Sequence, residues 1–261
     1  PEYCWTFPNH GWFFEQWLAQ QDAVFANNDN GRTERATEVA FNSDAGVAIL
    51  NFLKEQHDKG YLYYSGAQGG DSWGTVDQAF GAQQVAMTAY SSSDTAVYTQ
   101  TGVENGYDVL ASFLPYNDAT GWTGNLIGGA SLWLTEGLPV EEEDGALSFL
   151  LFLANTDNAA TWHQVTGYIA IRQSAVDALA GEGWFDENPN FRVASDQLAG
   201  STVTPATSGA LLGAFPQIRN VVTQAVDTVL LTADVDSAAV LNDAAAEANT
   251  ILEEYNLLNA E

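Results

Sequence analysis

The chain has 261 residues, enough for one large domain or two modest ones, and its 46% hydrophobic content can supply a buried core. It carries 34 acidic residues against 7 Lys and Arg, which gives a formal net charge of -27. No stretch approaches the roughly 18 apolar residues of a transmembrane helix, and no basic stripe offers a surface for nucleic acid.

The acidic surplus predicts a protein adapted to molar salt. At about 1 M salt the Debye length falls to roughly 3 Å, so repulsion between surface carboxylates is screened. Strong apolar periodicity and 12% aromatic residues exclude a disordered acidic chain. An ordinary acidic extracellular protein is the alternative. The single cysteine, Cys4, cannot form an intrachain disulfide, and we expect it to be buried as a small apolar side chain.

The first ninety residues predict short strands and helices in alternation. An aromatic-dense stretch at residues 1–25 leads to a turn at residues 27–31. The predicted elements that follow are a strand at residues 38–41, a helix that Ser43 or Asp44 caps and Gly60 ends, a weaker helix through Val76 and Phe80, and a strand at residues 85–90.

The rest of the chain continues the alternation. The predicted elements are a helix opening at residues 91–94, strands at residues 107–115 and 130–134, and helices at residues 141–153, from a cap at Thr156 or Asp157 to 166, 174–181, 217–231 and 236–258. Strands that alternate with helices indicate an α/β protein.

One pattern suggests nucleophilic catalysis. Residues 70–74 match the G-x-S-x-G elbow, in which the serine must follow a hydrophobic strand. The preceding residues 65–69 predict a loop, so Asp71 or Ser72 is better interpreted as a helix cap.

Metal and cofactor sites are not predicted. Asn28 to Gly31 hints at a calcium loop, but Ala26 and Thr37 stand at the positions where carboxylates are needed. The acidic run at residues 141–144 is typical of a helix's first turn. His10, His57 and His163 form no i,i+4 pair, and we expect His163 to be structural.

Arg219 is the strongest single candidate for ligand binding. It lies among apolar and neutral neighbours, in a chain with only five arginines and two lysines. Its planar donor fork suits phosphate or carboxylate, although a structural ion pair with an acid is the alternative.

Four further residues offer either a polar group or an accessible backbone. Ser91 and Ser92 lie between a predicted strand and a predicted helix, where hydroxyls and free N–H groups can bind a phosphate or sugar oxygen, or simply cap the helix. Gly129 permits close backbone approach to a ligand or a neighbouring strand. Tyr168 can aim its phenol into a cleft or pack.

The order and spacing of three segments carry a family resemblance. They are Gly128-Gly129-Ala130-Ser131-Leu132-Trp133, then Trp162-His163-Gln164 with Thr166-Gly167-Tyr168, then Pro216-Gln217-Ile218-Arg219. Together they resemble the periplasmic-type solute-binding proteins of ABC importers, and within these the glycerol-3-phosphate-binding branch, from about residue 6 to 258.

The resemblance implies a two-lobed α/β fold of the periplasmic-binding-protein class II type, with the ligand between the lobes. It places ligand contacts at Ser91, Gly129, Tyr168 and Arg219. It adds Ser92, the aromatic Trp12, and Phe7, because Phe7-Pro8 stands where the family has Trp-Pro.

The resemblance also implies a longer protein, whose first lobe would largely precede Pro1. Residues 1–109 and 168–261 would form the second lobe, and residues 110–167 would return to the first. It implies an extracellular, membrane-anchored binding protein that partners permease subunits and is not an enzyme.

The identity of the ligand stays open. Ser91-Ser92-Ser93 and Tyr168-Ile169-Ala170-Ile171 depart from the family's Ser-Ser-Gly and Tyr-Leu-Pro-Ile. Glycerol-3-phosphate, a glycerophosphodiester and a sugar are therefore alternatives. From other classes, a secreted hydrolase or a surface-layer component are further alternatives.

Overall fold

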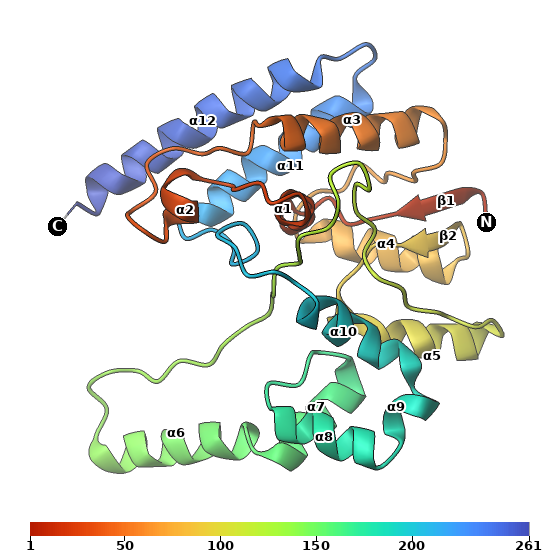
Figure 1. Cartoon of the computed structure of the whole chain (residues 1–261), viewed down its shortest axis with the longest axis vertical. Helices are drawn as coiled ribbons and strands as arrows, with labels where there is room; N and C mark the ends of the chain where they lie inside the picture. Colours follow the sequence, from red (N-terminus) through yellow and green to blue (C-terminus); the bar gives the residue numbers. More distant parts are fainter. Residues whose placement is uncertain (261) are drawn as a thin grey trace. The chain divides into compact units, whose positions relative to one another are not determined.

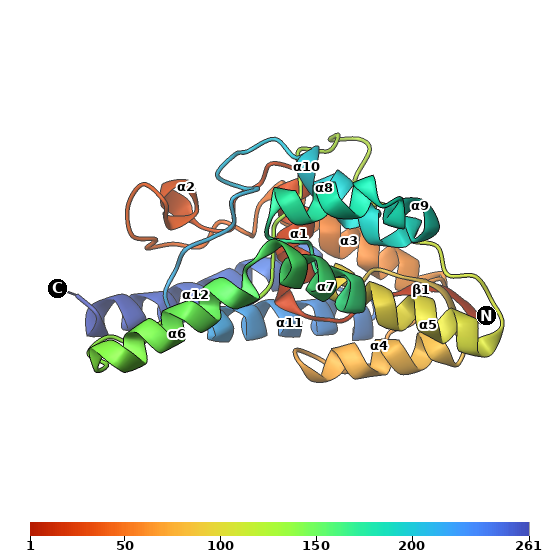
Figure 2. The same ribbon diagram turned by 90° about the horizontal axis from the view of Figure 1, so that it is seen from below.

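The computed structural model describes residues 1–260 and divides into two compact units. Unit 1 consists of Pro1–Tyr90, Leu114–Leu126 and Gly200–Glu261, and unit 2 consists of Ser91–Phe113 and Ile127–Ala199. Figures 1 and 2 trace the elements of both units along the chain.

Unit 1 contains a two-stranded parallel sheet. Strands β1 (Tyr3–Thr6) and β2 (Val85–Thr88) pair with Trp5 opposite Met87, and Trp5 also forms a parallel bridge to Leu62. A parallel pair needs a long crossover connection, which here contains the unit's first four helices. Because successive strand residues face opposite sides, Cys4 points outward and is exposed, so the prediction that it is buried is wrong.

The helices of unit 1 surround one hydrophobic core. They are α1 (Gly11–Gln20), α2 (Asn27–Gly31), α3 (Asp44–Asp58), α4 (Asp71–Gly81), α11 (Phe215–Leu231) and α12 (Ser237–Leu258). Helices α11 and α12 pack along each other and against α3, and α1 packs against α3 and α11 (Figures 1 and 2). Phe13, Leu50, Ile218 and Leu241 are fully buried where these four helices meet.

Helix α1 also holds the segment Leu114–Leu126 in place. The buried Gln16 side chain accepts from the Leu126 backbone N–H at 3.0 Å and donates to its carbonyl at 2.8 Å. One turn later, the buried Gln20 donates to the Leu114 carbonyl at 3.3 Å. The two glutamines thus fix the ends of this segment where it enters and leaves unit 1.

Unit 2 consists of short helices around a small aromatic core. Its elements are η1 (Ser92–Asp94), α5 (Thr95–Asn105), α6 (Val140–Leu153), α7 (Thr156–Thr166), α8 (Gln173–Gly181), α9 (Trp184–Glu187), η2 (Pro189–Arg192) and α10 (Val193–Ala199). Leu179, Phe185 and Phe191 form the buried cluster. Helix α6, in contrast, buries none of its residues.

Most predicted helices are confirmed, and so is the strand that ends near residue 90. Ser43 caps α3 by accepting from the Gly46 N–H, and Asp236 caps α12. Two caps were predicted wrongly. Asn155, and not Thr156 or Asp157, caps α7, and Gly70 precedes α4, so that Asp71 and Ser72 lie within its first turn.

Three predicted strands are wrong. Residues 38–41 form only a single bridge between Ala26 and Val39. Residues 107–115 and 130–134 form no strand within the described part of the chain. A strand is defined by a hydrogen-bonded partner strand, and among residues 1–260 the first segment pairs at one bridge only and the other two pair with no strand. The predicted turn at residues 27–31 is confirmed as a short left-handed turn, in which Asn28, Asp29 and Asn30 all have positive φ.

Within residues 1–260, no helix combines the length and the apolar character needed to cross a membrane.

Candidate ligand-binding site

Arg219 lies on the second turn of α11. Glu15 binds one edge of its guanidinium group, and Phe215 covers one face. Its Nε and Nη2 donate to the two carboxylate oxygens of Glu15 on α1, at 2.6 and 2.8 Å. Its guanidinium lies over the Phe215 ring, 4.4 Å from the centroid. Gly11 makes the approach possible, because a Cβ there would lie 2.8 Å from Arg219 Cγ. The arginine therefore has a fixed orientation.

Burial and charge act against each other at this pair. Glu15 exposes 7% of its side-chain surface and Arg219 exposes 31%. Burial raises the pKa of Glu15, and the hydrogen bonds and charge of Arg219 oppose that rise. The hydrogen bonds that Arg219 donates to Glu15 raise the pKa of Arg219. Both carboxylate oxygens accept short hydrogen bonds from a guanidinium, so the geometry is that of an ionised pair.

His10 completes the polar surroundings of Arg219. Its Nδ1 accepts from the Trp12 backbone N–H at 3.2 Å and so caps α1. Burial lowers the pKa of His10, and the positive charge of Arg219 lowers it further. The imidazole is therefore neutral near pH 7.

Arg219 borders a hollow of about 160 Å³ in unit 1. Most of its lining residues come from the N-terminal parts of α1, α4 and α11, and Thr223 comes from the middle of α11. The lining residues are His10, Gly11, Gly69, Gly70, Pro216, Arg219, Asn220 and Thr223. Each helix start carries the positive end of the helix dipole, and α1 and α4 add the backbone N–H groups of Gly11 and Gly70, whereas Pro216 of α11 has no N–H. With an arginine beside them, they can hold an anionic group.

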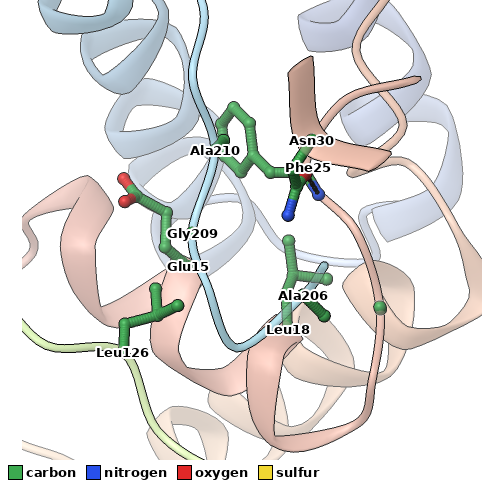
Figure 3. A pocket seen from close by; sticks show the side chains of 9 residues that line it. Glu15, Leu18, Phe25, Asn30, Leu126, Ala206, Gly209 and Ala210 are labelled. Atoms are coloured by element: carbon green, nitrogen blue, oxygen red, sulfur yellow. Dashed lines mark hydrogen bonds between the residues drawn. The ribbon is translucent and has the colours of Figure 1, made fainter. Parts of the chain in front are cut away.

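A second cavity borders Glu15 and is far smaller. It holds about 10 Å³, close to the minimum for one water. Figure 3 shows Glu15, Leu126, Leu18 and Phe25 around it. This cavity is too small for a solute.

In unit 2, the four predicted ligand positions Ser91, Ser92, Gly129 and Tyr168 lie near one another. Gly167 ends α7 with φ 105°, and a Cβ there would lie 2.3 Å from the Ser92 carbonyl oxygen. The α7 terminus therefore packs directly on the Ser91–Ser92 turn. A Cβ at Gly129 would lie 3.9 Å from the Tyr168 ring, which is 38% exposed. Hydroxyl groups and glycine backbone are thus gathered at one place.

His163 holds the backbone of Tyr168 in place. Because a carbonyl oxygen only accepts, His163 Nδ1 is the donor to Tyr168 O, at 2.6 Å. The ring is buried among Trp184, Phe185 and Phe191, with centroid distances of 5.6, 5.6 and 5.9 Å. The structural role predicted for His163 is therefore confirmed.

The predicted site residues divide between the units. Arg219, Phe7 and Trp12 belong to unit 1, and Ser91, Ser92, Gly129 and Tyr168 belong to unit 2. Phe7 is buried against Trp5, Phe13 and Trp17, which favours a packing role. Trp12 is half-buried, with its ring edge-on to Phe13.

Sequence reasoning missed the residues that hold Arg219. Glu15 lies 204 positions from Arg219, and no local pattern links the two. His10 is not a usual capping residue. The one available signal was a glycine, Gly11, at the start of an apolar helix, because glycine allows another element to approach closely.

The serine of the G-x-S-x-G pattern has the environment of a structural residue. Ser72 is buried in the first turn of α4, and its hydroxyl donates to the Gly69 carbonyl at 2.6 Å. Across residues 1–260, no cluster of three or more His, Cys, Asp or Glu side chains could hold a metal ion.

Comparison with known proteins assigns the chain to one family of binding proteins. Residues 2–193 match the family described as bacterial extracellular solute-binding protein, and the chain belongs to this family. The chain is 34% identical over 222 residues to the sn-glycerol-3-phosphate-binding periplasmic protein UgpB of Salmonella typhimurium, covering 84% of this chain and 49% of that protein. The same values hold for UgpB of Escherichia coli strain K12. The chain thus spans about half the length of the curated relatives it matches.

Solved structures show the same fold. UgpB from Mycobacterium tuberculosis in complex with glycerophosphocholine has a TM-score of 0.75 at 22% identity, covering 97% of this chain and 59% of that one. The sugar-binding protein MalE from Xanthomonas citri has a TM-score of 0.74 at 15% identity, covering 100% and 61%. The predicted periplasmic-binding-protein-like α/β fold is confirmed.

Proposed function

We propose that this chain forms part of the solute-binding protein of an ABC importer, which captures glycerol-3-phosphate or a related phosphate ester outside the cell. The observation that carries the proposal is Arg219, fixed in orientation at a hollow that three helix starts border. An arginine fork next to helix N-termini is suited to a phosphate group. The 34% identity to glycerol-3-phosphate-binding proteins supports the same ligand class.

The residues of unit 2 would bind the polyol part of the ligand. Ser91 and Tyr168 offer hydroxyl groups, and Gly129 offers backbone that a ligand can approach closely. Ser92 would orient the turn, and Trp12 of unit 1 would offer an aromatic surface. Ligand binding would favour a closed form, which the permease subunits at the membrane would recognise. The protein would not be an enzyme.

A sugar is the second candidate ligand. The likeness to MalE and other sugar-binding proteins favours it, because those structures share this fold. A competition experiment between glycerol-3-phosphate and maltose on the full-length protein would distinguish the two ligand classes.

Substitution of Arg219 tests the phosphate ligand. In the full-length protein, Arg219→Ala should weaken glycerol-3-phosphate binding by about 2–5 kcal/mol, measured by calorimetry, because a charged hydrogen-bonding partner is lost. Arg219→Lys should recover part of the affinity, since it restores the charge but not the planar fork. Arg192→Ala is the matched control, because Arg192 pairs with Asp196 on an exposed surface of unit 2.

Folding must be separated from binding in this experiment. Arg219→Ala leaves Glu15 buried without its partner, which is destabilising. The double variant Glu15→Gln with Arg219→Ala removes that unpaired charge and should fold, while still failing to bind. Wild-type affinity in either variant would contradict the phosphate role of Arg219.

We propose further that residues 110–167 pack on the first lobe of a longer protein, while residues 1–109 and 168–261 form the second lobe. Helix α6 supports this arrangement, because it buries none of its residues although its last turns are strongly apolar. Large exposed apolar surfaces mark contact sites. Amide hydrogen exchange in α6 should slow markedly in the full-length protein relative to this chain alone, and equal rates would contradict the assignment.

A further inference from the structure

Glu15 leaves one edge of the Arg219 guanidinium for a ligand. The carboxylate takes the Nε and Nη2 donors, and Phe215 covers one face. A guanidinium has five N–H donors, so both hydrogens of Nη1 and one of Nη2 remain. Within residues 1–260 the structure gives these hydrogens no other partner. The free edge can therefore form two parallel hydrogen bonds to a phosphate.

Glu15 also cancels the charge that the arginine brings. The ionised pair has no net charge, and His10 is neutral near pH 7. The remaining positive potential at the hollow comes from three helix starts, each equivalent to about half an elementary charge. Water also screens these partial charges. The local balance therefore suits a group with one negative charge better than a group with two.

We propose that Glu15 is a specificity-determining residue, which makes the site prefer a phosphodiester to a phosphomonoester. This inference rests on the proposed function, the capture of a phosphate ester by the full-length protein. A diester carries a single charge, whereas a monoester carries about two above its second pKa near 6. The second charge would lie close to the buried Glu15 carboxylate, where repulsion is only weakly screened.

The test compares two ligands that differ by one charge. Calorimetry on the full-length protein at pH 8 and constant salt would use glycerol-3-phosphate and its methyl diester. We expect the wild type to bind the diester about tenfold more tightly. Glu15→Gln keeps the size of the side chain and removes its charge, so the ratio of the two affinities should fall about tenfold, from the lost Coulomb repulsion. The methyl group affects both proteins equally, so its steric effect drops out when the two affinity ratios are compared.

A second variant separates charge from position. Glu15→Asp keeps the charge but shortens the side chain, so it should weaken both ligands and preserve the preference for the diester. Thermal melts would establish that each variant folds. If Glu15→Gln does not fold, the two affinities of the wild type are sufficient for the test. A preference for the monoester at pH 8 would then overturn the inference.

The remaining outcomes distinguish this inference from the proposed function. Binding of both phosphate ligands, with a ratio that Glu15→Gln leaves unchanged, would overturn the role of Glu15 and leave the function standing. Binding of neither phosphate ligand, or of maltose alone, would overturn both.

Discussion

The His10 imidazole caps α1, and because this ring is titratable, the start of the helix is sensitive to pH. The unprotonated Nδ1 accepts from the Trp12 N–H, so protonation of that nitrogen removes the acceptor. It would also place a positive charge near Arg219. Burial lowers the pKa of His10 and the positive charge of Arg219 lowers it further, so the neutral ring that caps the helix is favoured.

The consequence is a loss of stability in acid. A histidine whose pKa is lowered on folding contributes stability that is present above its unfolded value near 6.5 and is lost as the pH falls further. We expect the free energy of unfolding to fall by about 1 kcal/mol through this residue, the usual contribution of a cap. Urea unfolding between pH 7.5 and 5 would measure it.

His10→Asn provides the control, because asparagine is a good cap that does not titrate. Glu15 acts in the opposite direction: its raised pKa means that stability is gained as the pH falls. The difference between wild type and His10→Asn removes the Glu15 contribution. Equal pH profiles for the two proteins would exclude His10 as the sensitive group.

The role of a single residue was predictable where its type is rare in the chain and differs from its neighbours. Arg219 stands out because cations are scarce and its neighbours are apolar. Its partner Glu15 did not stand out, because one acid among 34 gives no signal without the fold. The contact between His163 and the Tyr168 carbonyl likewise depends on the turn at Gly167, whose geometry a sequence does not display.

At the scale of elements, Gly11 sets how closely α1 and α11 approach. A Cβ at Gly11 would lie 2.8 Å from Cγ and 3.0 Å from Cβ of Arg219, which are not the movable end of that side chain. Gly11→Ala should therefore displace Arg219 from Glu15, destabilise the fold by about 1–3 kcal/mol and weaken phosphate binding. Thermal unfolding and calorimetry on the full-length protein would measure both effects.

Gly74 in α4 is the matched control. Nothing lies within 4 Å of a Cβ built at this position. Gly74→Ala should leave binding unchanged and stabilise the protein by about 0.5–1 kcal/mol, because alanine favours the helix interior. If Gly11→Ala behaved like Gly74→Ala, the close approach of the two helices would not matter for the site.

Helices were predictable and strands mostly were not, for a physical reason. A helix satisfies its backbone hydrogen bonds within a few residues, so the caps at Ser43 and Asp236 are local signals. A strand depends on a partner elsewhere in the chain. Residues 130–134 are apolar and fit a strand, yet they find no partner among residues 1–260. The short β1 was missed because its partners, β2 and Leu62, lie far along the sequence.

At the scale of the whole molecule, the negative charge is largely unopposed. Seven lysines and arginines face 34 acids, and two of the ion pairs already use Lys54 and Lys59 within a single helical stretch. In α12, Glu253 and Glu254 are exposed in the last turns, where the helix dipole is itself negative. The folded chain therefore concentrates carboxylates that repel one another.

Stability should consequently depend on salt. At low ionic strength the carboxylates interact over about 30 Å, and at 1 M over about 3 Å. Compaction of a chain with a net charge of -27 is opposed by self-repulsion, so the melting temperature should fall as sodium chloride drops below about 1 M. Replacement of the exposed Glu247, Glu253 and Glu254 of α12 by glutamine should make this dependence shallower, because it removes charge without touching the core. Sucrose in place of salt separates screening from general exclusion effects, since it stabilises without screening. A melting temperature that is the same in dilute and molar salt would contradict the adaptation to high salt inferred from composition.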